Sequence, residues 1–517
     1  MKRLLIVIAA ALSFACTRQE VIFLNNMTAE CTLKKGEVIM LPVQEDAPAA
    51  KLYVIGNKEK IQYDILPATS TVDYHVQYKA EDNCVVRIEG VSFQSVFYKK
   101  LKRGHDGKKH SFLHFTPSSG WINDPNGLVY KDGVWHMYFQ YNPFFSKWGN
   151  MSWGHATSKD LVNWKEHPVA LMPDSLGMIF SGSAACDKNR IAAMYTSAGK
   201  GQSQSLAWSY DGGMTYVKLP SNPVLKSSNP DFRDPKIFRY EDSWRMVLAS
   251  GNTIEIYSSS NLIDWDYESC FGEEIGNHGG VWECPDLFEL PYLDGKKWVL
   301  LVSNTRDTNH GSAVQYFIGD FDGSEFTPCD NNVRWLDYGR DFYAAASWND
   351  APDGRRVAIA WANNWQYAND IPFVGTRGGM TVPRELSLLD YGDDIVLKNK
   401  PVHEIVHTLP HVAGRNPFIW EGKVVDGDEI VLRNKCGEAL KISFSRNVVS
   451  VNRRFSGNVT FNDAYPSIDR APIQASETHD VSLLVDSNLV EIFIDDGAVS
   501  FTESVFPSRQ YSIIDIW

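Results

Sequence analysis

A local repeat with a period near 50 residues is the feature that most constrains the fold of this chain. Residues 158–164 (SKDLVNW) match residues 259–265 (SSNLIDW) in spacing, and the two tryptophans lie 101 positions apart. A weaker copy starts at residue 209 (SYD) and leads to Tyr216, about midway between them. Short strand-like runs fill this region, and helical periodicity is nearly absent. In an all-β region such a period is typical of propeller blades, and a competing β-sandwich is not expected to show it.

Five polar motifs fall on the same period. They are centred on Asp124, Ser181, Asp234, Glu283 and Tyr343, in the segments 121–127 (WINDPNG), 180–183 (FSGS), 232–235 (FRDP), 282–286 (WECPD) and 341–344 (DFYA). Successive centres are 49 to 60 residues apart. Because the innermost strands of a propeller line its central channel, we expect Asp124, Asp234 and Glu283 to converge at one mouth of that channel. Each of the three is followed closely by proline, which stiffens the backbone.

The first motif also predicts its own local structure. Pro125 biases Asp124 towards an extended backbone, and Asn126-Gly127 favours a turn. The run from Leu128 to Tyr130 then reads as a strand. Asp124 is therefore expected at a strand start, beside aromatic surface and between two amide side chains, which suits the presentation of a carboxylate to a polar ring. A turn that happens to contain Asp is the alternative for this stretch alone.

Three carboxyl groups in one pocket repel each other when all are ionised. At least one of them should therefore have a raised pKa and be protonated near neutrality. A protonated carboxyl beside an ionised one is the arrangement that glycoside cleavage requires. Neither a metal nor a cofactor is predicted, because the eight cysteines contain no CxxC pair and no histidine spacing fits metal ligands. The cysteine spacing predicts no disulfide framework either.

The two ends of the chain differ from this central region. A basic start and an apolar run over residues 4–15 predict a secretory signal, and residues 13–16 (SFAC) resemble a bacterial lipobox, so that Cys16 is the predicted lipidation site within a signal at 1–16. An ordinary cleaved signal is the alternative. The protein is thus predicted to be exported, as a lipoprotein at the cell surface or the periplasmic face of a membrane. The formal net charge of −13 argues against nucleic acid as a partner.

Two further regions flank the repeat. Residues 21–103 predict a small β-rich accessory domain, with strands at 38–41, 52–55 and 85–88, and the basic segment 99–109 reads as a linker. This domain could bind polymer, space the rest from a membrane or buttress it. Residues 405–517 alternate around Asp-Ser-Asn and Asp-Asp-Gly turns, which predicts an antiparallel β-sandwich.

Taken together, the motifs at 121–127, 180–182, 233–235 and 283–285 resemble glycoside hydrolase family 32, the β-fructofuranosidases that include invertases, inulinases and levanases. The resemblance extends over about residues 110–517. It implies an all-β fold, with a five-bladed β-propeller at 110–395 followed by a β-sandwich at 405–517. This agrees with the period of the repeat.

The resemblance also implies roles for individual residues. Asp124 would be the nucleophile, Glu283 the acid and then the base, and Asp234 the residue that holds sugar hydroxyls and stabilises an oxocarbenium-like transition state. The implied substrate-binding residues are Asn123, Gln140, Trp148, Phe180, Ser181, Arg233, Trp361 and Trp365. Asp286 and Asp341 are candidates for hydrogen-bond partners that orient the site.

The implied activity is that of a retaining hydrolase that releases terminal fructose from a fructan (levan or inulin), with sucrose as a further candidate substrate. The alternatives are an endo-acting levanase or inulinase, a five-bladed arabinan- or xylan-type glycosidase, and a non-catalytic glycan-binding lipoprotein. The last predicts the loss of a catalytic carboxylate, and all three are present.

Single residues have alternatives as well. Arg233 could simply pair with Asp234, and Cys284 could be a buried filler or could adjust the polarity around Glu283. Trp148 and Trp365 could be packing residues rather than sugar platforms.

Overall fold

The computed structural model describes residues 22–25, 27–56, 60–80, 82–90, 98–100, 113–411 and 413–517. The chain divides into two compact units, Met1–His105 and Asp106–Trp517. The predicted signal with Cys16, and most of the predicted linker, lie outside the described residues, so lipidation stays a prediction. No helix within the described ranges is long and apolar enough to cross a membrane.

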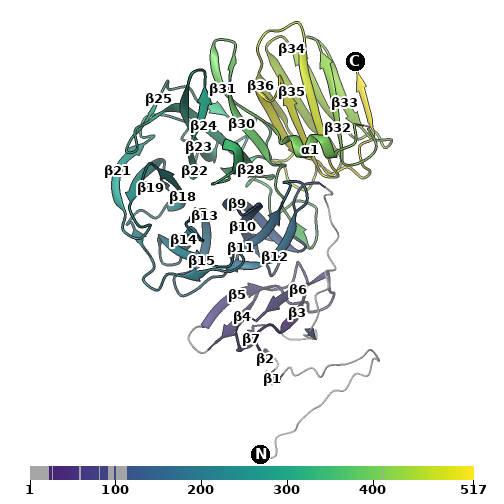
Figure 1. The fold of residues 1–517 in the computed structure, drawn as a ribbon. Coiled ribbons are helices and arrows are strands. Elements are labelled where there is room, and N and C mark those ends of the chain that lie inside the picture. Colours follow the sequence, from purple (N-terminus) through teal and green to yellow (C-terminus); the bar gives the residue numbers. More distant parts are fainter. Residues whose placement is uncertain are drawn as a thin grey trace, which may run out of the picture. The chain divides into compact units, whose positions relative to one another are not determined.

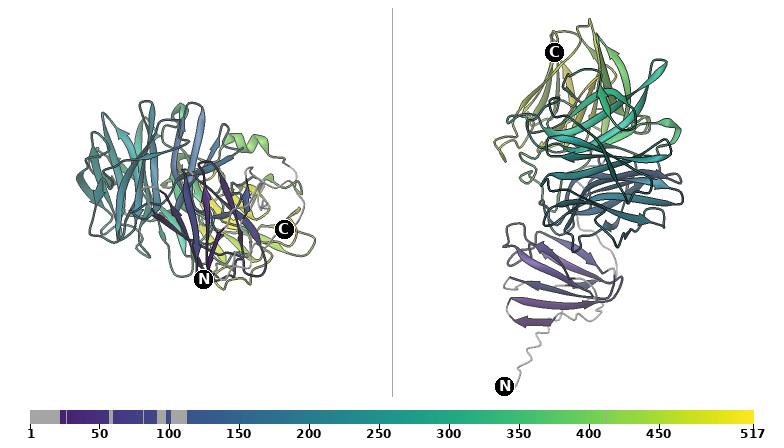
Figure 2. Two further views of the ribbon diagram at one scale, coloured as in Figure 1. Left: turned by 90° about the horizontal axis from the view of Figure 1, so that it is seen from below. Right: turned by 90° about the vertical axis from the view of Figure 1, so that its left-hand side faces the viewer.

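The described residues of the N-terminal unit form two small sheets, drawn in purple in Figure 2. One has the order β1-β2-β7-β4-β5 and the other β6-β3-β8. In β4 every second side chain is buried, which is the pattern of a strand with one face on a core. The three strands predicted from the sequence in this region are confirmed. The bounds are β1 (Ile22–Asn25), β2 (Thr28–Leu33), β3 (Val38–Val43), β4 (Ala50–Ile55), β5 (Lys60–Ile65), β6 (Tyr74–Lys79), β7 (Cys84–Glu89) and β8 (Tyr98–Lys100).

Five sheets follow one another along the second unit, and the all-β prediction is confirmed. Their neighbouring strands are antiparallel, except that β29 pairs in parallel with β9. The first sheet contains β9 (Gly120–Lys131), β10 (Val134–Asn142), β11 (Ser152–Ser158), β12 (Lys165–Leu171) and β29 (Thr376–Arg377). The second contains β13 (Met178–Asp187), β14 (Arg190–Ala198), β15 (Gln202–Ser209), β16 (Val217–Lys218) and β17 (Leu225–Lys226).

The third sheet contains β18 (Phe232–Tyr240), β19 (Ser243–Ser250), β20 (Thr253–Ser259) and β21 (Asp266–Phe271). The fourth contains β22 (Glu283–Tyr292), β23 (Gly295–Thr305), β24 (Ser312–Phe321), β25 (Phe326–Pro328) and β26 (Arg334–Trp335). The fifth contains β27 (Tyr343–Ser347), β28 (Val357–Trp361), β30 (Arg384–Tyr391) and β31 (Asp394–Pro401), with the 3-10 turn η1 (Pro352–Gly354) between its first two strands.

The first strands of these sheets lie next to each other. Strand β13 contacts β9 and β18, β22 contacts β18 and β27, and β27 contacts β9. These contacts close a ring, and Figure 1 shows β9, β13, β18 and β22 near its centre with the later strands farther out. Buried aromatic and aliphatic side chains fill the space between neighbouring sheets. Each motif identified in the sequence therefore lies at, or one to two residues before, an inner strand.

A C-terminal module of two facing sheets follows helix α1 (His403–Thr408). One sheet has the order β32-β37-β38-β39 and the other β36-β35-β34-β33-β40, and both contribute to one apolar core. We refer to residues 418–516 as the C-terminal module. Its strands are β32 (Phe418–Val424), β33 (Glu429–Arg433), β34 (Ala439–Ser445), β35 (Val448–Phe455), β36 (Ile468–Pro472), β37 (His479–Val485), β38 (Leu489–Ile494), β39 (Val499–Ser504) and β40 (Ile513–Ile516).

The predicted turn at Asn126-Gly127 is wrong. Strand β9 runs through both residues, and its register with β10 shifts twice, once on each side of the Pro125–Asn126 pair. Gly127 has a φ of 53°, and a β-carbon there would lie 2.6 Å from the ring of Tyr138. The glycine is thus needed because a ring packs closely on an irregular strand, not because the chain reverses.

Candidate active site

A β-bulge lies at each of the five motifs. On the first strand of every sheet the register shifts across three residues, between Ile122 and Pro125, Ile179 and Gly182, Arg233 and Lys236, Glu283 and Asp286, and Tyr343 and Ala346. A bulge inserts one extra residue and redirects the side chains beside it. The φ angles of Asp234 (65°), Cys284 (49°) and Ala344 (53°) are positive, which marks the bulged residue in three of the strands.

These bulges explain the prolines of the motifs. A proline in a regular inner strand would remove a ladder hydrogen bond. Pro235 and Pro285 lie inside their bulges, where the pairing is already interrupted. These two strands can therefore carry proline directly after Asp234 and two residues after Glu283.

Asp124 is held by two side-chain donors. The hydroxyl of Ser181 donates to Oδ2 at 2.6 Å, and the amide of Asn123 donates to Oδ1 at 3.0 Å. The Asn123 amide is itself oriented, because its oxygen accepts a hydrogen bond from the indole of Trp121 at 2.8 Å. These donors favour the ionised carboxylate. Asn123 and Ser181, both predicted from the sequence, thus contact Asp124 directly.

Asp234 is buried beside the next bulge. Its own backbone N–H donates to the hydroxyl of Thr196 at 3.0 Å, and the backbone N–H of Cys284 donates to its Oδ2 at 3.0 Å. The Cys284 sulfur lies 3.6 Å from that same oxygen and 3.7 Å from Oδ2 of Asp124. Cys284 therefore bridges the two aspartates, and no disulfide joins any of the seven cysteines in the described ranges.

Glu283 is partly accessible, with 27% of its side chain exposed, compared with 5% for Asp234. Arg233 contacts Oε1 at 3.1 Å, and the hydroxyl of Tyr343 donates to Oε2. Arg233 also bonds Asp231 at 2.6 Å, whereas its distance to Asp234 is 4.0 Å. Arg233 is thus a partner of Asp231 and Glu283, and lies farther from its sequence neighbour Asp234.

The electrostatics follow from burial and mutual repulsion. Burial and the charge of Glu283 raise the pKa of Asp124, while the hydrogen bonds from Ser181 and Asn123 lower it. Burial raises the pKa of Asp234 to about 7; the charge of Arg233 opposes this shift, and the charges of Glu283 and Asp124 add to it. The prediction that at least one carboxyl has a raised pKa is confirmed. Burial also raises the pKa of the Cys284 thiol well above its usual value, which keeps the thiol protonated.

Aromatic side chains lie beside these groups. Trp361 is fully buried and supports Trp365, whose ring centroid lies 4.7 Å away. Trp365 also stacks on Trp121 at 6.0 Å and leaves 38% of its surface exposed. Trp148 is 40% exposed and meets the half-buried Phe180 edge-on at 6.2 Å. Trp148 and Trp365 thus offer the exposed faces that sugar platforms need.

The other predicted residues are more remote. Gln140 is buried and donates to the backbone oxygen of Ile179 at 3.0 Å, so it links the first two inner strands. Asp286 accepts hydrogen bonds from Lys236 at 3.1 Å and from the backbone of Ser347, which ties three inner strands together. Asp341 bonds Arg453 of the C-terminal module at 2.6 Å.

Two contributions were missed from the sequence. The hydroxyl of Tyr343 was not assigned to the site, although Tyr343 lies on the motif period and that period is the signal that could have found it. Cys284 was considered a tuner of Glu283, but its sulfur contacts the two aspartates.

Asp234→Asn is expected to raise the thermal stability of the ligand-free protein at pH 8 but not near pH 4. Because the pKa of Asp234 is raised from 3.8 to about 7, the folded chain binds a proton more tightly than the unfolded chain. The stability from that proton is fully present below the unfolded pKa and is lost as pH rises through the folded pKa. The gain for the uncharged Asn should be about 1–2 kcal/mol at pH 8, measured by calorimetry across this range.

A matched control for this change is Asp160→Asn. Asp160 lies in the first copy of the local repeat, where hydrogen bonds lower its pKa, and Asn261 occupies the corresponding position in the later copy with similar turn contacts. It should show no gain at pH 8. Equal Tm values for wild type and Asp234→Asn at pH 8 would contradict the expectation.

Chemically, the arrangement combines two different carboxyl groups. Asp124 is half-buried and fixed by donors that favour the anion, and Glu283 is half-buried between a cation and a phenol. A fixed anion can attack an electrophilic carbon, and an accessible carboxyl can exchange protons with a leaving group and with water. Asp234 adds a third carboxyl whose charge responds to its neighbours.

Comparisons with known proteins agree with this chemistry. The sequence models of the glycosyl hydrolases family 32 N-terminal domain and C-terminal domain match residues 114–401 and 429–517. A levanase of Bacillus subtilis (strain 168) is 42% identical over 456 residues, covering 78% of this chain and 67% of the relative. An extracellular exo-inulinase of Aspergillus niger is 34% identical over 484 residues, covering 77% and 89%.

A solved structure is also similar. The crystal structure of exo-inulinase from Aspergillus awamori superimposes with a TM-score of 0.71 at 31% identity, covering 80% of this chain and 96% of the other. The family model over residues 114–401 spans more than half of the chain. The chain therefore belongs to glycosyl hydrolases family 32 and is a glycosidase.

Proposed function

We propose that this glycosidase hydrolyses β-D-fructofuranosyl linkages with retention of configuration, and that it removes terminal fructose from levan or inulin and also cleaves sucrose. The observation that carries the proposal is the convergence of Asp124, Asp234 and Glu283 on neighbouring bulges, where Cys284 contacts both aspartates and Arg233 pairs with Glu283. The relatives named levanase and exo-inulinase support fructan as the substrate class.

The first step forms a covalent intermediate. The Asp124 carboxylate attacks the anomeric carbon of the fructosyl unit while Glu283 donates its proton to the glycosidic oxygen. The bond from carbon to the leaving oxygen breaks, and an ester bond to Asp124 forms. Ser181 and Asn123 hold the attacking carboxylate in one orientation, which lowers the entropic cost of the attack.

The second step releases fructose. Glu283, now a carboxylate, takes a proton from water, and the resulting nucleophile attacks the anomeric carbon and breaks the ester bond. Asp124 leaves as a carboxylate and Glu283 regains its proton. Two inversions at the same carbon give net retention. The partial exposure of Glu283 allows it to meet both the leaving oxygen and water.

Asp234 and the aromatic residues bind the sugar in this proposal. The Asp234 carboxylate accepts hydrogen bonds from sugar hydroxyls and stabilises the positive charge that develops at the anomeric carbon. Trp148, Phe180 and Trp365 provide apolar faces, and the ring of Trp361 packs against Trp365. Arg233, Asn123, Ser181 and Gln140 complete the fructose subsite, the last by fixing the spacing of β10 and β13.

We further propose the fold as a five-bladed β-propeller at 110–395 and a β-sandwich at 405–517, after a β-rich accessory domain at 21–103. The ring of contacts among β9, β13, β18, β22 and β27 supports five blades. The shared apolar core of the two C-terminal sheets supports the sandwich. Export of the protein is in line with the relative named as extracellular.

The test of the function is the time course of products from levan, inulin and sucrose. An exo-acting enzyme gives fructose as the only early product from a polymer, whereas an early ladder of short fructans would show endo action. NMR spectra recorded immediately after the enzyme is added should show β-fructofuranose first, because double displacement retains configuration. Inverted product would contradict the mechanism, and no release from any of the three substrates would refute the proposed function.

A further inference from the structure

The segment 362–375 joins β28 to β29 and carries the exposed Trp365; we call it the rim segment. Trp365 is at the tip of a turn, because the backbone N–H of Tyr367 donates to the backbone oxygen of Asn364 at 3.1 Å. Both ends of this turn are buried. The amide of Asn364 donates to the backbone oxygens of His310 and Arg340, each at 2.9 Å. One end of the turn is therefore fixed by the ring of sheets.

The other end is fixed by the C-terminal module. The Tyr367 hydroxyl donates to Oδ1 of Asp341 at 2.7 Å and accepts a hydrogen bond from Arg453 at 2.8 Å. Arg453, on β35, also pairs with Oδ2 of Asp341 at 2.6 Å, and the side chains of both are fully buried. Ser504, on β39, donates to that oxygen from its backbone and its hydroxyl, each at 2.8 Å.

Aromatic packing surrounds the same anchor. The Tyr367 ring lies edge-on to Tyr465 at 5.4 Å and to Phe461 at 6.3 Å, and both partners belong to the C-terminal module. Asn462, between them, donates to Asp370 of the rim segment at 2.7 Å. The rim segment is thus bonded to the C-terminal module at Tyr367 and again three residues later.

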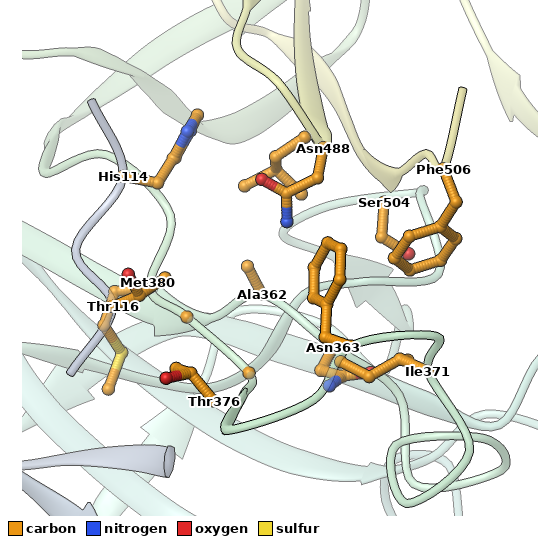
Figure 3. A pocket seen from close by; sticks show the side chains of 14 residues that line it. His114, Thr116, Ala362, Asn363, Ile371, Thr376, Met380, Asn488, Ser504 and Phe506 are labelled. Carbon is orange, nitrogen blue, oxygen red and sulfur yellow. The ribbon is translucent and has the colours of Figure 1, made fainter. Parts of the chain in front are cut away.

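Away from this anchor the rim segment borders a small cavity. Figure 3 shows a cavity with Ala362, Asn363 and Ile371 on one side and Asn488 and Phe506 of the C-terminal module on the other. Its volume is about 30 Å³, and Nδ2 of the buried Asn363 has no hydrogen-bond partner among the described residues. A cavity of this size has room for about one or two water molecules. Beside it, Ile371 and Phe373 of the rim segment pack in an apolar cluster with Phe506.

We infer that Tyr367 is a positioning residue, through which the C-terminal module sets the place of Trp365 in the aromatic wall of the active site. The buried Arg453–Asp341 pair is held by further bonds, because Arg453 also bonds Glu503 at 3.1 Å and Asp341 also accepts from Ser504. Tyr367 bonds both members of that pair and lies two residues from Trp365. The inference rests on the proposed function only in assigning Trp365 to the sugar site.

The experiment compares Tyr367→Phe with Tyr511→Phe. Both changes remove one buried hydroxyl, but Tyr511 bonds the backbone oxygen of Ser456 inside the C-terminal module. Tyr367→Phe should raise KM for inulin oligosaccharides about fivefold and leave kcat within about twofold. It should also speed hydrogen exchange of the amides in the rim segment. Tyr511→Phe should leave KM, kcat and the exchange of the rim segment unchanged.

A double-mutant cycle with Trp365→Ala shows whether Tyr367 acts through Trp365. If it does, Tyr367→Phe has little further effect on KM in the Trp365→Ala background. An equal effect in both backgrounds would overturn the inference. Should Tyr367→Phe fail to fold, Asn462→Ala removes the outer bond to Asp370 and should shift KM and exchange in the same direction by a smaller factor.

Hydrogen exchange of the rim segment tests the inference independently of enzyme activity. Unchanged exchange of the rim segment in both Tyr367→Phe and Asn462→Ala would overturn the inference whatever the kinetics. An inactive wild-type protein would refute the proposed function, while faster exchange in these variants would still show that the C-terminal module positions the rim segment.

Discussion

Replacing Asp124 with Asn is expected to lower kcat on levan, inulin and sucrose about 10⁴-fold or more, with KM changed less than about tenfold. The amide cannot form the ester intermediate, because it lacks the negative charge and the lone-pair reactivity of a carboxylate. Binding should persist because Asn has nearly the same shape. Initial rates and KM values from each substrate measure the effect.

The fold should survive this change. The Ser181 hydroxyl can rotate to accept from the new amide, and the Asn123 amide can still donate to its oxygen. Loss of one negative charge also relieves repulsion of Asp234, whose raised pKa is due partly to Asp124. Calorimetry should therefore find a Tm no lower than that of the wild type at neutral pH.

Asp160→Asn serves as the control here too, since it makes the same chemical change in a surface turn of the first sheet. Its kcat should equal that of the wild type. If Asp124→Asn retained more than about a hundredth of the wild-type kcat, Asp124 could not be the nucleophile.

The period of the motifs predicted the centre of the fold because each motif lies at the same place in its sheet. Asp124, Ser181, Asp234, Glu283 and Tyr343 all occur on the first strand of a sheet, at a register shift. Repetition is a signal that survives in the sequence even when each copy has different residues. The convergence of three carboxyl groups followed from that signal alone.

The local structure of the motifs was harder to predict. Asn126-Gly127 favours a turn when only its neighbours in sequence are considered. In the structure, β10 pairs with β9 on both sides of this dipeptide. The dipeptide therefore lies within the strand, next to two shifts in register. A bulge depends on pairing with another strand, so a single segment does not distinguish it from a turn.

Contacts between distant segments were not predictable at all. Nothing in the spacing of Cys284 indicates that its thiol faces Asp124 and Asp234, since Glu283 is its neighbour in sequence. Arg453 and Asp341 are 112 positions apart, with Arg453 on β35 and Asp341 in the loop before β27. Their pairing depends on how the C-terminal module packs against the loop before β27, which a periodic pattern within either region does not encode.

Glu283→Ala is expected to lower kcat on levan, inulin and sucrose about 10³- to 10⁴-fold, because no group then protonates the leaving oxygen. The loss should be far smaller for an aryl β-fructofuranoside whose phenol is acidic enough to leave without a proton. For that substrate the second step becomes limiting, since no base activates water. Azide, which needs no base, should then restore turnover and give β-fructofuranosyl azide.

The matched control is Glu289→Ala, on the same strand, where Glu289 pairs only with Lys296 at the surface among the described residues. It should leave kcat on all substrates unchanged. In Glu283→Ala the fructosyl ester on Asp124 should accumulate from the aryl substrate, and mass spectrometry of the Asp124 peptide should detect it. If Glu283→Ala cleaved polymer at a substantial rate, another residue would have to be the acid. If azide restored turnover but gave the α-azide, displacement would be direct and Asp124 would not form an ester.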